Sequence, residues 1–246
     1  YYLFRILEAL GIIDPQGKMY FVRFFHAFYS LFIVYYGYKI TELLSGRVLA
    51  KKAGLILALI WFMPFMSVRN LIEMVCIPPL MIGFYFLIRN KNIKKYIFIA
   101  GIFFGLSWIF RYQTILLTGS IGLILIFTKQ YKNLLLLVFG FLVSALLIQG
   151  TVDYIAWGYP FASFVFYLIH NAEHGSDYTT GPFYNYLLLL TGLLLPPVSL
   201  MLLYGFGSFW KKHYIIILPV LTFFIFHSIY PNKQERFILP VVPLIV

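Results

Sequence analysis

Four basic residues stand beside long apolar segments, where charge is costly unless something uses it: Arg69, Arg111, Lys233 and Arg236. Placing one arginine at membrane depth costs roughly 2.5–3.5 kcal/mol. Several such cations around one cavity therefore indicate a binding site for an anion. Guanidinium groups bind phosphate through two parallel hydrogen bonds, so these residue types predict a lipid-phosphate site. Each cation taken singly is also explained by anchoring at a membrane surface.

Polar and aromatic side chains near these cations are candidates for orienting a substrate. They are Glu73, Gln113, Asp153, Asn171, Tyr178 and Tyr184. Glu73 follows Arg69 by four residues, so on a helix the two would share a face and pair, and a plain ion pair explains them equally well. Asp153 is also explained as the polar residue that ends an apolar segment. The polar loop 175–186 carries tyrosines suited to stacking on sugar rings, and loops of this length are often functional.

A second motif points to different chemistry. His170-Asn-Ala-Glu173-His174 matches the pattern His-x-x-Glu-His, which binds zinc in one class of metalloproteases. On a helix, His170 and His174 would share a face, with Glu173 as the base. The pattern is short, no third ligand is apparent, and Gly175 ends the segment. We keep a zinc membrane protease as a minor alternative and expect no metal site.

Composition indicates that membrane-spanning helices position these residues. The chain is 62% hydrophobic and only 11% charged, whereas a soluble domain carries about 25% charged residues. Its net charge of +11 is spread over small clusters at the ends of apolar segments, which argues against a nucleic-acid partner. Cys76 is the single cysteine, so no disulfide forms within the chain. We expect one multi-pass, all-α membrane domain over residues 1–246.

Apolar runs predict the individual spans. We expect them at 20–40, 53–68, 71–88, 96–110, 113–128, 133–151, 187–209 and 214–229, with a partial span from 237. Alternation along this order gathers twelve of the 19 Lys and Arg residues on one side, namely Lys39, Arg47, Lys51, Lys52, Arg89, Lys91, Lys94, Lys95, Lys129, Lys132, Lys211 and Lys212. By the positive-inside rule this side is cytoplasmic. The segment 152–186, which has no Lys or Arg, falls on the outer face with the four cations, and its aromatic residues from Trp157 to Tyr167 predict an interfacial helix.

The segment Asn-Lys-Gln-Glu-Arg-Phe-Ile-Leu-Pro at 232–240 resembles the His-Lys-Glu-x-Arg-Phe motif of the dolichyl-phosphate-mannose-dependent α-mannosyltransferases. These multi-pass enzymes of the GT-C superfamily build GPI anchors and dolichol-linked oligosaccharides. The similarity extends over about 19–242. Its other parts are Arg23, His26, Ser30, Arg69 to Glu73, Arg111, Asp153 to Pro160, Asn171, Tyr178, Gly181, Pro182 and Tyr184.

The resemblance implies a helical bundle of GT-C type with interfacial helices in an outer-face loop. It implies transfer of a mannose or similar hexose from a polyprenyl- or dolichyl-phosphate sugar to a glycan or glycolipid acceptor. The donor phosphate would be bound by Arg69, Arg111, Lys233 and Arg236, with no cofactor and no metal. The site would face outward from a membrane, and short cytoplasmic turns favour a bacterial cytoplasmic membrane over the endoplasmic reticulum.

Two departures from the family pattern concern the chemistry. Asn232 and Gln234 stand where the family has His and Glu, so Lys233, Arg236 and Phe237 are the retained residues. The family's acidic first outer loop is not found in the chain. We therefore expect its catalytic aspartate upstream of residue 1, and a chain truncated at both ends. A transporter or flippase for lipid-linked sugars is the main alternative, because the same cations would bind a lipid phosphate without transferring the sugar.

Overall fold

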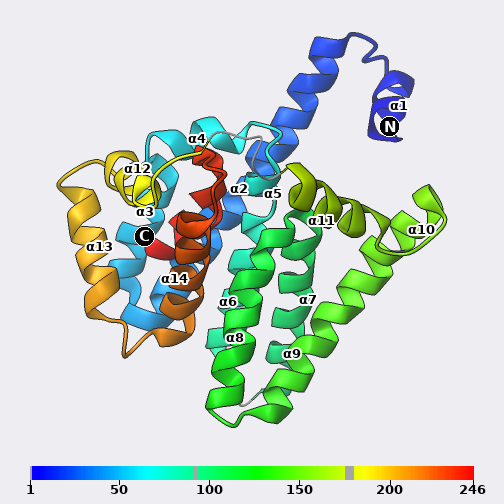
Figure 1. Cartoon of the computed structure of the whole chain (residues 1–246). Coiled ribbons are helices and arrows are strands. Elements are labelled where there is room, and N and C mark those ends of the chain that lie inside the picture. Colours follow the sequence, from blue (N-terminus) through cyan, green and yellow to red (C-terminus); the bar gives the residue numbers. More distant parts are fainter. Residues whose placement is uncertain (1, 91–92, 175–179) are drawn as a thin grey trace.

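The computed structural model describes residues 2–90, 93–174 and 180–246, and the described chain is helical (Figure 1). The helices of the first part are α1 (Tyr2–Ala9), α2 (Pro15–Ser45), α3 (Arg47–Leu59), α4 (Phe62–Ser67), α5 (Ile72–Val75), α6 (Ile77–Arg89) and α7 (Lys94–Phe110). Then come the 3₁₀ turn η1 (Tyr112–Thr114), α8 (Ile115–Phe127), α9 (Tyr131–Ser144), the π-helical turn η2 (Ala145–Gly150), α10 (Thr151–Trp157) and α11 (Ala162–His174). The last part has α12 (Asn185–Leu193), α13 (Val198–Ser208), α14 (Tyr214–Ile229), the 3₁₀ segment η3 (Glu235–Val241) and α15 (Val242–Ile245).

Several expected spans are helices of membrane-crossing length. Ile72–Arg89 and Tyr131–Trp157 are long and apolar enough to cross a bilayer, and α12 with α13 forms a bent pair that would make a third span. The expected span 133–151 is thus extended at both ends, because η2 and α10 continue α9. The predicted helices at 20–40, 96–110, 113–128 and 214–229 are also present, within α2, α7, α8 with η1, and α14.

Two of the expected spans, 53–68 and 187–209, are each divided into two helices, and prolines explain both breaks. The segment 53–68 breaks after α3, since Ile60 is extended (φ −59°, ψ 124°). A helix continued to Pro64 would lose the hydrogen bond to the Ile60 carbonyl and clash with it. The segment 187–209 bends by 118° between α12 and α13, where Pro196 and Pro197 follow one another.

The bundle around α6, α7 and α9 is packed closely enough to hold its ends rigid. Gly101 on α7 and Gly140 on α9 face the partner helix, and a Cβ at either would collide with the carbonyl of Leu137 or Phe98. Small residues of this kind let helix backbones approach closely in membranes. Phe84 and Phe104 meet edge-to-face at 5.2 Å between α6 and α7. Helix α11 lies over the upper end of this bundle in Figure 1, where Phe164 packs against Trp108 of α7 with ring centroids 5.2 Å apart.

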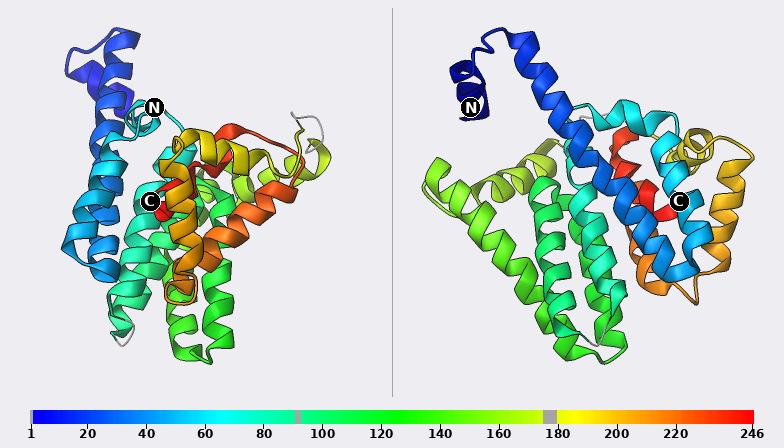
Figure 2. Two further views of the ribbon diagram at one scale, coloured as in Figure 1. Left: turned by 90° about the vertical axis from the view of Figure 1, so that its left-hand side faces the viewer. Right: turned by 180° about the vertical axis from the view of Figure 1, so that it is seen from behind.

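The two ends of the bundle differ in charge. The C-terminal ends of α2, α6, α8 and α13 lie at the lower end in Figures 1 and 2. Basic clusters of the sequence stand at or just after these helix ends. The segment η3 and the helices α5, α11 and α12 lie at the opposite end. The arrangement matches the predicted grouping of the loops, with the outer-face candidates at one end.

Candidate functional site

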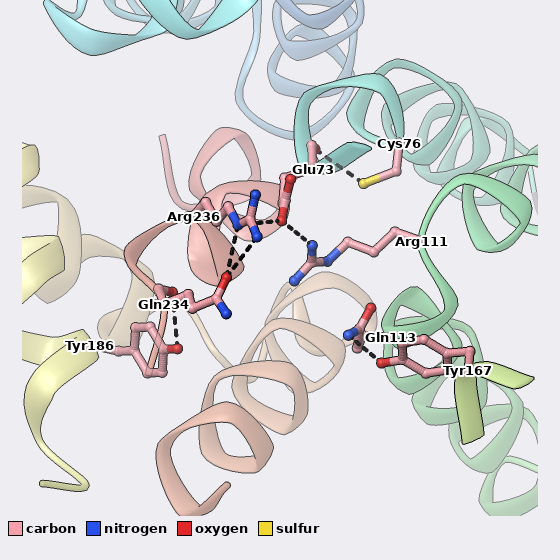
Figure 3. Close-up of polar contacts among 8 residues, drawn as sticks. All are labelled: Glu73, Cys76, Arg111, Gln113, Tyr167, Tyr186, Gln234 and Arg236. Carbon is pink, nitrogen blue, oxygen red and sulfur yellow. Dashed lines mark hydrogen bonds and ion pairs between the residues drawn. The ribbon is translucent and has the colours of Figure 1, made fainter. Parts of the chain in front are cut away.

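Glu73 lies at the centre of the site, at the start of α5, and is 1% exposed. Its Oε1 lies 2.6 Å from Nη1 of Arg111 and 3.3 Å from Nε of Arg236, and both contacts are ion pairs (Figure 3). Two guanidinium groups from distant parts of the chain thus share one carboxylate oxygen. The formal charges of the three side chains leave one positive charge in excess, so the cluster attracts a further anion.

Arg111 is held in place by the end of α7. The backbone leaves the helix at this residue in an extended conformation, and the side chain is buried beside Glu73. Its guanidinium carbon lies 4.8 Å from the centroid of the Phe237 ring. Nε and Nη2 of Arg111 and Oε2 of Glu73 are buried without a hydrogen-bond partner. Buried charged groups are normally satisfied, so these orphaned atoms indicate a place for a ligand.

Arg236 is the accessible cation of the cluster, with a side chain 49% exposed. Nε and Nη2 donate to Oε1 of Gln234 at 3.0 and 2.8 Å. The backbone carbonyl of Gln234 accepts from the hydroxyl of Tyr186 at 3.1 Å, which ties η3 to α12 (Figure 3). Gln234 therefore orients Arg236 toward Glu73 by means of its amide oxygen.

The ammonium group of Lys233 binds backbone carbonyls, whereas the sequence predicts that it binds the donor phosphate. Nζ donates to the carbonyl oxygens of His227, Ser228 and Tyr230 at 2.7, 2.6 and 2.5 Å. All three ammonium protons are thereby engaged with the C-terminal end of α14, as is common for lysines near a helix end. Burial lowers the pKa of this ammonium. Lys233 fixes the course of the chain into η3 and is not turned toward Glu73.

Arg69 does not pair with Glu73, because the helix on which both were expected is broken. α4 ends at Ser67 and α5 begins at Ile72, so the spacing of four residues does not align the two side chains. Arg69 is exposed, with its guanidinium 4.1 Å from the centroid of the Phe65 ring. The partners of Glu73 are instead Arg111 and Arg236.

The interfacial helix α11 brings two predicted residues to the same region. Nε2 of Gln113 donates to the hydroxyl of Tyr167 at 2.5 Å, and Nδ2 of Asn171 donates to the backbone carbonyl of Tyr167 at 2.7 Å. Burial raises the pKa of the Tyr167 phenol, which keeps it a neutral hydroxyl. Tyr167 itself was expected only as an interfacial aromatic residue, and the structure places it at the site.

Asp153, on α10, is hydrogen-bonded to the first turn of α11. Its carboxylate accepts from Nε2 of Gln149 at 2.8 Å, and from the backbone nitrogen and hydroxyl of Ser163 at 3.0 and 2.6 Å. Asp153 is 2% exposed, and both of its oxygens are used. It therefore joins α10 to the first turn of α11. The chain can fold back between the two helices because Gly158 adopts a left-handed conformation (φ 82°).

The structure describes one of the two candidate tyrosines of the polar loop. Tyr178 lies outside the described residues. Tyr184 stands at the start of α12, exposed to 48%, with its ring 5.5 Å from that of Phe183. The chain just before Tyr184 lies against the motif at 232–240, since Thr180 and Asn232 form a β-bridge.

Three adjoining cavities surround the cluster. The arginine cavity, of 260 Å³, is lined by residues that include Glu73, Arg111, Gln113, Tyr167, Asn232 and Arg236. The α4–α12 cavity, of 770 Å³, is mainly apolar, has Trp61, Phe65 and Leu188 in its walls, and shares Gln234 and Arg236 with the arginine cavity. The aromatic cavity, of 270 Å³, lies between α8, α11 and α14 and shares Gln113, Tyr167 and Asn232 with the arginine cavity.

Asn232 and Gln234 line the arginine cavity. The sequence shows them only as replacements for the ionisable pair of the family motif and predicts no role for either at the site. Asn232 is 5% exposed, and its Oδ1 has no hydrogen-bond partner. Their position within the motif at 232–240 is the sequence feature that points to the site.

The zinc-binding alternative finds no support in the described part of the chain. His170 and His174 lie on α11 with ring centroids 5.0 Å apart. Within residues 2–90, 93–174 and 180–246, no group of three or more His, Cys, Asp or Glu side chains is placed to hold a metal ion. The exposed Glu173 stands on the same helix.

Comparison with solved structures supports the fold. The chain is similar to ArnT from Cupriavidus metallidurans bound to undecaprenyl phosphate, with a TM-score of 0.77 and 16% identity over 99% of this chain and 47% of that one. The match to ArnT in the apo state has a TM-score of 0.62 and 13% identity over 99% and 46%. The chain thus spans about half the length of these structures. The likeness confirms the predicted all-α fold of GT-C type.

Comparison of sequences identifies the family. No curated protein matches the chain. A model of the Alg9-like mannosyltransferase family, however, matches it from residue 1 to residue 246. This agrees with the resemblance of the motif at 232–240, and the chain belongs to the Alg9-like mannosyltransferase family.

Proposed function

We propose that the chain forms the donor-binding part of a glycosyltransferase that moves mannose, or a similar hexose, from a polyprenyl-phosphate carrier to a glycan or glycolipid acceptor. The observation that carries the proposal is the buried Glu73–Arg111–Arg236 cluster with its unsatisfied atoms. A phosphate on Arg236 and Arg111 would satisfy the orphaned guanidinium nitrogens. The arginines, rather than a metal ion, would then stabilise the leaving phosphate.

The α4–α12 cavity is suited to the carrier lipid. It is the largest of the three cavities, its walls are mainly apolar, and Arg236 stands at its boundary with the arginine cavity. A polyprenyl chain in it would present its phosphate to Arg236. The solved ArnT structure was obtained with undecaprenyl phosphate, a ligand with the same combination of chain and phosphate.

The proposed reaction is a direct displacement at the sugar. The acceptor hydroxyl oxygen bonds to the anomeric carbon, and the bond from that carbon to the phosphate oxygen breaks with its electron pair moving to the phosphate. The hydroxyl proton passes to a carboxylate base. Configuration at the anomeric carbon is inverted. We propose that the site opens on the extracytoplasmic face, opposite the turns with the basic clusters.

The test is mannose transfer from a polyprenyl-phosphate donor by the detergent-solubilised protein, with EDTA present. Arg236→Ala should lower transfer by at least about tenfold, the effect of losing a hydrogen bond to a charged group. The matched control is Arg47→Ala, since Arg47 also contacts a glutamate, Glu42, at 3.1 Å, but its side chain is 83% exposed at the opposite end. Equal transfer by both variants would refute the phosphate role, and absence of product in the unaltered protein would favour a transporter.

A further inference from the structure

The aromatic cavity adjoins the arginine cavity and extends from it between α8, α11 and α14, beyond the donor phosphate as proposed above. Its volume of 270 Å³ is close to the 260 Å³ of the arginine cavity. The two cavities share six lining residues, namely Tyr112, Gln113, Tyr167, Asn171, Asn232 and Phe237, whereas the α4–α12 cavity joins the arginine cavity at Gln234 and Arg236. The three cavities therefore form a series, with the cationic cluster in the middle.

Asn232 lies where the aromatic cavity meets the arginine cavity, and it offers a hydrogen-bond acceptor to a ligand there. The residue is 5% exposed, and its backbone is fixed by the bridge to Thr180. Its Oδ1 is buried and has no hydrogen-bond partner among the residues that the structure describes. A buried amide oxygen of this kind normally receives a hydrogen bond. A hydrocarbon chain would leave the oxygen unsatisfied, whereas a hydroxyl group would satisfy it.

The walls of the cavity favour a flat, partly apolar ligand. Tyr112, Phe164, Tyr230 and Phe237 contribute aromatic rings, and Asn171 contributes an amide. A sugar ring has an apolar face of C–H groups and a rim of hydroxyls, so it matches rings and amides together. The volume lies just below the roughly 300 Å³ at which sites for drug-sized ligands begin. A single hexose ring suits that size.

Tyr167 forms the boundary between this cavity and the phosphate site. Its hydroxyl is hydrogen-bonded to Gln113 at 2.5 Å, and its ring lies 5.0 Å from that of Tyr112. Both contacts hold the phenol between the two cavities. Gln113 and Tyr167 would therefore contact a sugar in either the arginine cavity or the aromatic cavity.

We propose that the aromatic cavity binds the hexose of the acceptor that receives the transferred sugar, with Asn232 Oδ1 accepting a hydrogen bond from one of its hydroxyls. This rests on the proposed glycosyltransferase function. In an inverting displacement the acceptor approaches from the side opposite the leaving phosphate. The series of cavities has that order, with the carrier chain at one end, the phosphate in the middle and the acceptor at the other end.

The experiment compares two leucine-to-tryptophan variants in the detergent-solubilised protein. Leu168 lines the aromatic cavity and Leu188 the α4–α12 cavity, and both are exposed, at 51% and 60%. Binding of methyl α-D-mannopyranoside is followed by saturation-transfer NMR, and binding of undecaprenyl phosphate by equilibrium titration. Leu168→Trp should abolish the mannoside signal and leave the lipid affinity unchanged, whereas Leu188→Trp should do the reverse.

A third variant, Asn232→Ala, tests the hydrogen bond from the sugar hydroxyl to Oδ1 alone. Asn232→Ala removes an oxygen that has no protein partner, and it should weaken mannoside binding by about fivefold. A mannoside signal that is absent from the unaltered protein, or that survives both Leu168→Trp and Asn232→Ala, overturns the assignment. Loss of undecaprenyl phosphate binding in Leu168→Trp would also overturn it, by showing a lipid chain in the cavity. Failure of the unaltered protein to bind undecaprenyl phosphate would count against the proposed function instead.

Discussion

Glu73 determines the electrostatics of the site, because one buried carboxylate serves two guanidinium groups. Its contact with Arg111, at 2.6 Å with both side chains 1% exposed, is an ion pair that water does not screen. Removing one member of such a pair leaves an uncompensated buried charge, whereas removing both can be nearly neutral. The pair should therefore be strongly coupled.

A double-mutant cycle measures this coupling. Glu73→Leu alone should destabilise the protein by about 3–5 kcal/mol, since Arg111 is left buried without its partner. Glu73→Leu combined with Arg111→Met should cost clearly less than the sum of the single variants. Thermal unfolding in detergent provides the comparison. Additive effects of the two substitutions would show that the residues do not interact in the folded protein.

At the scale of the elements, the site depends on how α11 is held across the bundle. Asp153 makes three hydrogen bonds, to Gln149 and Ser163, and so fixes α11 relative to α10. Through α11 it places Tyr167 and Asn171 beside the cavities, although its own carboxylate contacts neither. Asp153 is a positioning residue in this structure.

Loss of this contact should be seen in the dynamics of α11. Asp153→Ala leaves the donors of Ser163 and Gln149 unsatisfied, so amide hydrogen exchange in α11 should correspond to about 1–3 kcal/mol less protection. Asp153→Asn keeps an acceptor oxygen and should restore part of it. Asp14→Ala is the matched control, since Asp14 accepts from Gly17 at the start of α2. Unchanged exchange in α11 of the Asp153→Ala protein would contradict the positioning role.

The sequence predicts helices and their grouping better than it predicts side-chain partners. Apolar runs set most spans, but Pro64 and the Pro196–Pro197 pair divide two of them. Arg236 was expected at the site and lies there. Lys233 was expected beside it, but its ammonium is bound by carbonyls at the end of α14, which only the folded chain brings near. Likewise, the spacing of Arg69 and Glu73 predicts a pair only if one helix continues through both.

Considered as a whole, the described chain has two ends that differ in charge and in cavities. Basic clusters of the sequence stand at one end, and the Glu73–Arg111–Arg236 cluster (Figure 3) with its three adjoining cavities lies at the other. The fold is similar to that of about half of ArnT, and the chain belongs to the Alg9-like mannosyltransferase family. The proposed function requires that the cluster recognise the phosphate of a carrier lipid and not its chain alone.

Comparing undecaprenyl phosphate with undecaprenol tests that requirement most directly, because the two lipids differ only in the phosphate. The affinity of the detergent-solubilised protein should be at least about tenfold higher for the phosphate, as expected for charge-assisted hydrogen bonds. Arg236→Ala should remove most of this difference and Arg47→Ala none of it. Equal affinity for the two lipids, or a preference that survives Arg236→Ala intact, would contradict the account.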